Sequence, residues 1–145
     1  MKRFLPFVIA ALLIPGVALA KSNPNQGTHP NHGKAKVQYI LKGQLTAYTA
    51  FDSSTSTNGS ITITVTHSNR HGHVLKGLPL IFDGMVASST KVVLGDGVTV
   101  IADNDLGIVK VRAPKQPKDV SGADLAALLT GMPVRQIIDQ GPPAS

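Results

Sequence analysis

The chain has 145 residues, a formal net charge of +6 with its histidines neutral, and no cysteine. The lack of cysteine excludes disulfides, a lipoprotein anchor, a thiol nucleophile and a thiolate metal site. All eight acidic residues are aspartates, which excludes the glutamate that completes an EF-hand calcium loop.

Residues 1–20 have the organisation of a secretory signal peptide. Two basic residues precede an apolar stretch, and the segment ends in the small-residue pattern ALA. A membrane-spanning helix needs about 20 unbroken apolar residues, and Pro15-Gly16 interrupts this stretch. We therefore expect cleavage after Ala20, and a secreted or extracytoplasmic protein with no membrane span after signal removal.

Composition divides the rest of the chain into three parts. Residues 21–36 are rich in Asn, Pro, Gly and Lys and nearly free of apolar side chains, so we expect a flexible leader there. Residues 37–140 carry regular apolar patterns and are predicted to form one β-barrel domain. Residues 141–145, GPPAS, are predicted to be a disordered tail.

Alternating apolar residues predict the first two strands. A long period-two pattern begins at Val37, with Gly43 as an expected bulge, and the segment SITITVTH follows at residues 60–67. Together they predict an antiparallel hairpin with a long loop, in which Asn58-Gly59 can take positive φ. The apolar residues on one side of these strands are Val37, Tyr39, Leu41, Leu45, Ala47, Phe51, Ile61, Ile63 and Val65.

Shorter extended segments follow, separated by turn residues. Pro79 marks the first of them as an edge or bent strand, and Gly95-Asp96-Gly97 predicts a turn between two others. The predicted segments are residues 74–82, 90–94, 97–101, 107–113 and 134–140.

One helix is expected late in the chain. Ser121 and Asp124 form an S-x-x-D capping box, which predicts a helix start at Ser121. Gly131 followed by Pro133 predicts its end. The leucines that share one face of this helix are Leu125, Leu128 and Leu129.

These elements predict a mainly β fold: a small five- to six-stranded OB-like barrel with one short helix near the C-terminus. Closure of the sheet would remove exposed edges, which invite aggregation when the strands are rich in β-branched residues. An open sandwich is the alternative.

The order of several segments resembles that of exported bacterial domains of unknown function with a small OB-like barrel. The resemblance covers roughly residues 37–140 and implies a fold and a compartment, but no activity. The helix lies later here than in a standard OB-fold, where it follows the third strand. The segments that carry the resemblance are GQLTAYTAFD, GSITITVTHSN, TKVV, GIVKVRAP and VRQIID.

Three histidines lie within seven positions, at His67, His71 and His73. A loop could bring these imidazoles together on zinc or copper, with Asp83 or a water as the fourth ligand. The same segment, HSNRHGH, also has the composition of an ordinary polar turn. We favour the turn and keep metal binding as the alternative function.

Basic residues are densest after residue 109. Lys110 and Arg112 alternate along one predicted strand, Lys115 follows, and Arg135 lies on the last strand. These four could bind an anionic envelope polymer or another exported protein. The alternative is a solvated strand face that opposes edge pairing. No nucleic acid is expected, because the aromatic residues available for base stacking are few after residue 20: Tyr39, Tyr48, Phe51 and Phe82.

Catalytic motifs are absent from the sequence, which contains no G-x-S-x-G, H-E-x-x-H or G-x-x-x-x-G-K pattern. Asp103-Asn104-Asp105 begins like a calcium loop, but we interpret it as a turn with Asx hydrogen bonds. The sequence therefore predicts an exported non-catalytic module of unknown specific function that binds an anionic or extended partner.

Overall fold

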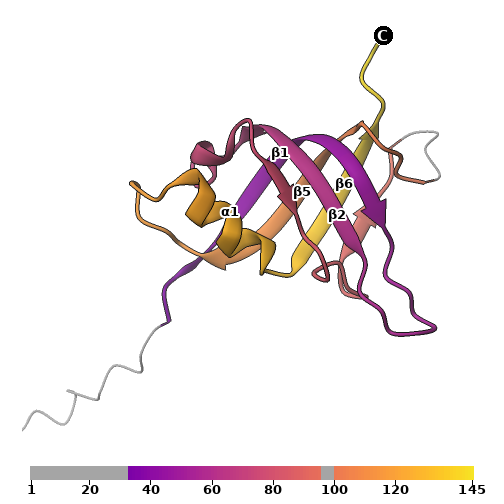
Figure 1. Ribbon diagram of the computed structural model, residues 1–145, viewed down its shortest axis with the longest axis horizontal. Coiled ribbons are helices and arrows are strands. Elements are labelled where there is room, and N and C mark those ends of the chain that lie inside the picture. The colour runs from indigo at the N-terminus through magenta and orange to yellow at the C-terminus, as the bar shows by residue number, and fades with distance from the viewer. Residues whose placement is uncertain (1–32, 96–99) are drawn as a thin grey trace, which may run out of the picture. The chain divides into compact units, whose positions relative to one another are not determined.

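A six-stranded mixed sheet and one short α-helix make up the part of the chain that the computed structural model describes, residues 33–95 and 100–145 (Figure 1). The mainly β fold and the single late helix are confirmed. The predicted signal peptide, its cleavage point, most of the leader and part of the turn at residues 95–97 lie outside the described residues. The elements are β1 Lys36–Thr49, β2 Ser60–Ser68, the 3-10 helix η1 His73–Leu75, β3 Pro79–Ile81, β4 Lys91–Val93, β5 Asp105–Pro114, α1 Gly122–Thr130 and β6 Val134–Gly141.

The strands run in the order β3-β2-β1-β5-β6-β4. Neighbouring strands are antiparallel except β4 and β6, which are parallel. The predicted hairpin is confirmed, since β1 pairs with β2 from Leu41 opposite Ser68 to Thr49 opposite Ser60. The long β1 is therefore central and pairs with β5 on its other side.

The sheet is open, so the expectation of a closed barrel is not met. The two edge strands, β3 and β4, have three residues each and are not paired with each other. The chain after β3 instead makes isolated contacts: the Val86 carbonyl accepts from the Gly59 N–H (2.8 Å), and the Met85 carbonyl accepts from the Val134 N–H (3.1 Å). This segment links the starts of β2 and β6 without forming a strand.

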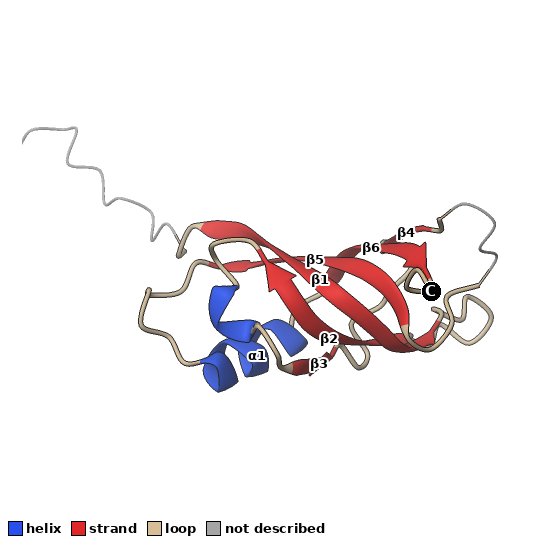
Figure 2. Cartoon of the chain, turned by 90° about the horizontal axis from the view of Figure 1, so that it is seen from above, coloured by secondary structure: helices blue, strands red, loops and turns tan. Residues whose placement is uncertain are grey.

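Buried aliphatic residues from alternate positions form the core. Ile61, Ile63 and Val65 of β2 are all fully buried, as their alternation with threonine predicts. Helix α1 packs near β3 and η1 (Figure 2) and contributes Leu125 and Leu129. Other buried core residues are Tyr39, Leu41, Leu45, Leu75, Leu80, Phe82, Val109, Val111 and Ile137.

Two bulges interrupt the pairing of β1 with β2. At the first, Lys42 and Gly43 lie opposite His67 and Val65, so the extra residue is Thr66 of β2 and not Gly43, where we expected the bulge. At the second, the register shifts in β1 between Leu45 and Ala47. The second shift was not predicted, and it turns Ala47 toward solvent while Tyr48 pairs with Ile61. The expected continuation of the apolar side to Ala47 is therefore wrong, because a bulge reverses the facing of every later residue.

Two predictions about the backbone are wrong. Residues 73–75 form a 3-10 helix at the start of the predicted extended segment 74–82. Gly77 has a φ of 86°, which is incompatible with a strand at that position. In the β1–β2 loop the positive φ belongs to Ser56, at 55°, rather than to Asn58 or Gly59. Gly59 is needed for another reason: a Cβ there would collide with the backbone of β1 at Thr49.

Helix α1 begins as predicted. The Ser121 Oγ accepts from the Asp124 N–H (3.1 Å) and donates to the Asp124 Oδ2 (2.7 Å). This side chain satisfies one of the free N–H groups at the helix start. Gly131 ends the helix in a right-handed conformation, with φ of −80°, so its glycine freedom is not used.

Candidate anion-binding face

Six basic side chains lie on the outer side of the sheet, and we call this surface the basic face. Residues of β1 and β5 alternate in burial, so that Tyr39 and Val111 are buried while the residues next to them face outward. The basic face consists of Lys36 and Lys42 on β1, Lys91 on β4, Lys110 and Arg112 on β5, and Arg135 on β6.

Strand pairing sets these residues side by side. Lys110 lies opposite Gln136, and Gln136 lies opposite Lys91, so one row of the sheet carries two lysines two strands apart. Arg112 lies opposite Gln38 of β1. Directly opposite residues point to the same face of a sheet, so the pairing holds these side chains on one surface.

A bulge in β6 adds Arg135. Val134 lies opposite Val111 and Gln136 opposite Lys110, which leaves Arg135 as the extra residue between two pairs. Arg135 is exposed and borders a shallow depression of about 480 Å³. The residues that line this depression are Lys36, Gln38, Arg112 and Arg135.

Acidic residues of the same strands do not share this surface. Within the described strands, the only aspartates of β1, β4, β5 and β6 are Asp105 and Asp139, and both are buried on the inner side. Like charges held close together repel one another, and the repulsion is relieved when an anion binds. The basic face is therefore an electrostatically unbalanced surface suited to a negatively charged partner.

The structure brings together three of the four basic residues that the sequence suggested. Lys110, Arg112 and Arg135 share the basic face, with Lys110 half-buried and the two arginines exposed. Lys115 does not join them; it lies in the loop between β5 and α1, beside the histidine turn. Sequence reasoning missed Lys36, which it assigned to the leader although β1 begins there.

Two further members were also missed. Lys42 follows the period-two pattern of β1 and could have been found from it. Lys91 could not, because it reaches the basic face only through the parallel pairing of β4 with β6. Such a pairing joins segments that are distant in the sequence, and no local pattern records it.

The three histidines are not gathered at one point. His67 lies on β2 opposite Lys42, with its Nδ1 3.2 Å from the Thr66 Oγ1. His71 and His73 line a different depression, the one that includes Lys115. Among residues 33–95 and 100–145, no group of three or more His and Asp side chains could hold a metal ion. The zinc or copper alternative stays a prediction, without an assembled ligand set.

The suggested fourth ligand, Asp83, lines yet another depression, together with residues of β3 and α1. The segment Asp103-Asn104-Asp105 is a turn, with Asn104 at a φ of 66°. The Asp105 Oδ2 accepts from the Ala102 N–H (3.0 Å), three residues earlier in the chain. This bond differs from the expected Asx hydrogen bond, in which the side chain accepts from an N–H two residues further on.

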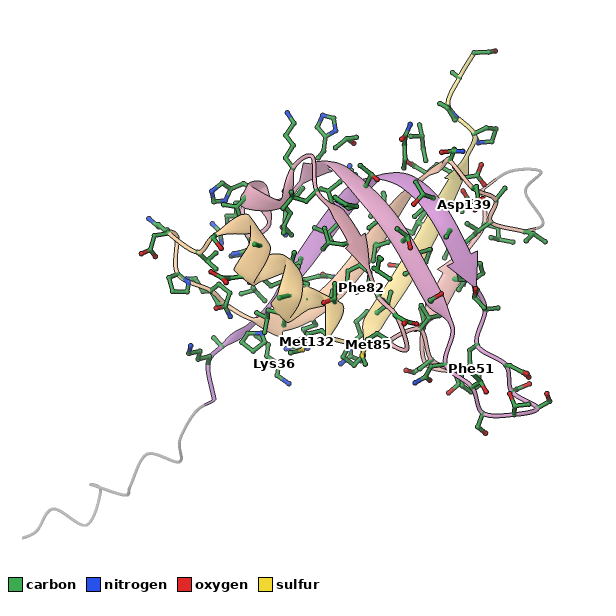
Figure 3. All side chains as sticks on the ribbon, in the orientation of Figure 1. Lys36, Phe51, Phe82, Met85, Met132 and Asp139 are labelled. Atoms are coloured by element: carbon green, nitrogen blue, oxygen red, sulfur yellow. The ribbon has the colours of Figure 1, made fainter. Side chains whose placement is uncertain are left out.

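The two inward aspartates form a separate polar feature at the opposite end of the sheet from Lys36 (Figure 3). The Asp139 Oδ1 accepts from the Gly141 N–H (2.9 Å), whereas its Oδ2 is buried without a hydrogen-bond partner. Burial raises the pKa of Asp139, and the neighbouring Asp105 carboxyl raises it further. This carboxyl therefore favours its neutral form more than an exposed aspartate does.

No helix in the described part of the chain has the length and apolar character needed to span a bilayer. Comparisons of the chain with models of protein families, with curated proteins and with solved structures found no match.

Proposed function

We propose that this protein is an exported, non-catalytic module that binds an anionic polymer of the cell envelope through the basic face. The convergence of Lys36, Arg112 and Arg135 from three strands around one depression is the observation that carries the proposal. The signal-like residues 1–20 support the compartment. The resemblance to exported OB-like domains supports the same compartment, although the sheet is open.

The layout of the charges favours an extended polymer over a single small anion. Lys36 and Lys42 lie six residues apart on β1, which corresponds to roughly 20 Å along a strand. Lys110 and Lys91 lie two strands apart, which corresponds to roughly 10 Å across the sheet. A chain with repeating sulfate, phosphate or carboxylate groups can meet several of these cations at once, and a small anion cannot.

Dextran sulfate titration at two salt concentrations tests this function. We expect the variant Lys36→Gln/Arg112→Gln/Arg135→Gln to bind the polymer at least about tenfold more weakly than the wild type, because three exposed charge contacts are lost. We also expect wild-type affinity to fall steeply as NaCl rises from about 50 to 300 mM, because salt screens exposed charges. Isothermal titration calorimetry measures both effects.

A matched variant removes the same charge elsewhere. Lys76, Lys115 and Lys118 are exposed and lie outside the basic face. Their joint replacement by glutamine should leave polymer affinity within about twofold of the wild type, apart from the long-range effect of net charge. Equal weakening in the two triple variants would show that net charge, and not the basic face, determines binding.

A further inference from the structure

A second depression lies between the histidine turn and the loop that joins β5 to α1. It has a volume of about 420 Å³ and we call it the turn pocket. It shares no lining residue with the depression on the basic face. The residues that line it are Arg70, His71, His73, Lys115, Gln116, Pro117, Lys118 and Val120.

We propose that the turn pocket binds a small organic anion, in which a carboxylate or phosphate group is joined to an apolar body. The inference goes beyond the proposed function, because it concerns a different surface and a different class of ligand. It also gives the histidine-rich turn a role that does not require a metal.

The charges of the turn pocket support an anion. Three of its lining residues, Arg70, Lys115 and Lys118, carry permanent positive charge and come from two segments far apart in the sequence. No aspartate is among the lining residues. Asp119, the nearest acid in the sequence, is exposed and lies outside the lining. A concave surface lined by one sign of charge concentrates ions of the other sign.

Arg70 has guanidinium donors that are free for a ligand. The His73 Nδ1 donates to the Arg70 carbonyl (3.1 Å), which fixes the histidine ring against the turn. The Arg70 Nε donates to the His71 Nε2 (3.4 Å), which uses one of the five guanidinium N–H groups. The remaining four are the type of paired donors that carboxylate and phosphate accept from arginine.

The turn pocket is also anchored to the sheet. The His71 ring meets the Tyr39 ring edge to face, with 6.1 Å between ring centroids. On the other wall, the Pro114 carbonyl accepts from both the Tyr39 hydroxyl (3.2 Å) and the Gln116 Nε2 (3.0 Å). Tyr39 therefore contacts both walls from the core and fixes their relative positions, which reduces the entropy cost of ligand binding.

Two apolar lining residues indicate that the ligand has an apolar part. Pro117 and Val120 are lining residues, and Val120 packs against the hydrophobic core. A volume of about 420 Å³ lies within the usual range for small-molecule sites, roughly 300–1,000 Å³. An anion without an apolar body would leave this surface in water, so both parts of the ligand are needed for affinity.

Benzoate is the probe for the test, because it joins a carboxylate to an aromatic ring. Titration of the purified, ¹⁵N-labelled protein at pH 6 should give saturating amide shifts in residues 70–73 and 115–120 together. Benzamide, which lacks the charge, and acetate, which lacks the ring, should each bind at least about fivefold more weakly. Shifts that do not saturate, or that appear on only one of the two segments, would overturn the proposal.

Variants separate this pocket from the basic face. Lys115→Gln/Lys118→Gln should weaken benzoate binding about fivefold, as expected for two partly exposed ion pairs. The Lys36→Gln/Arg112→Gln/Arg135→Gln variant should bind benzoate as the wild type does, even if polymer binding proves absent. Lys76→Gln is the control within the same turn region. If Lys76→Gln weakens benzoate binding as much as Lys115→Gln/Lys118→Gln does, the proposal is contradicted.

Discussion

Asp139 places a carboxyl group inside the sheet, where the side chain is fully buried. Its Oδ2 has no hydrogen-bond partner, and the Asp105 carboxyl lies nearby on β5. Both burial and this neighbour raise the pKa of Asp139. Folding therefore makes the group harder to ionise, so ionisation of Asp139 costs the folded chain more free energy than it costs the unfolded chain.

Replacement of Asp139 by Asn should raise the free energy of unfolding at pH 7. The Asn Oδ1 can still accept from the Gly141 N–H, and the Nδ2 supplies a donor toward Asp105 in place of an unpartnered oxygen. Relief of one buried unsatisfied group is worth about 1–3 kcal/mol. Urea unfolding at a series of pH values measures the effect.

The sign of the pH dependence follows from the raised pKa of Asp139. As pH rises from the unfolded pKa, about 3.9, the unfolded chain releases this proton before the folded chain does, so stability falls until pH passes the folded pKa. The advantage of Asp139→Asn should therefore be smallest at about pH 3.5 and full above the folded pKa. The exposed Asp83→Asn variant should show no such gain. A gain of equal size at all pH values would contradict this account.

Gly43 allows β1 to be the central strand. It lies at a bulge, opposite Val65 of β2 and Gly107 of β5. A Cβ at this position would overlap the backbone carbonyl oxygen of Thr64. Because backbone atoms of a central strand cannot move without breaking the ladder, the close approach of β1 and β2 requires glycine here.

The variant Gly43→Ala should lower the free energy of unfolding by about 2–3 kcal/mol, the cost of overpacking at a site that cannot relax. The matched control is Gly33→Ala, where a Cβ would meet no atom within 4 Å. Urea denaturation, analysed with a common m-value, measures the free energy of unfolding of both variants. Equal stability of the two variants would show that β1 and β2 separate at the bulge without cost.

Local sequence patterns were sufficient to predict the features that neighbouring residues determine. The alternation in β2, the outward Lys110 and Arg112 of β5, and the Ser121 cap of α1 were all predicted from neighbouring residues. The depression on the basic face was not, because Arg135 joins it through a bulge in β6 and Lys36 through the pairing of β1 with β5. Register and bulges depend on contacts distant in the sequence.

The fold as a whole separates its charges. Cations occupy the outer side of β1, β4, β5 and β6, whereas the aspartates of these strands are buried on the inner side. Each cation on the basic face is closer to other cations in the folded chain than in the unfolded one. The folded protein therefore carries a repulsive free energy that screening by salt reduces.

This repulsion predicts a salt effect that does not depend on any ligand. The melting temperature of the wild type should rise by about 2–4 °C when NaCl increases from about 20 to 300 mM, because about 0.5–1 kcal/mol is recovered as the charges are screened. The variant Lys36→Gln/Arg112→Gln/Arg135→Gln should melt higher than the wild type at low salt and respond less to NaCl. The control variant Lys76→Gln/Lys115→Gln/Lys118→Gln, with the same net charge, should keep most of the salt response. If both variants respond alike, the repulsion belongs to the whole surface, and the clustering of cations on the basic face carries no electrostatic strain.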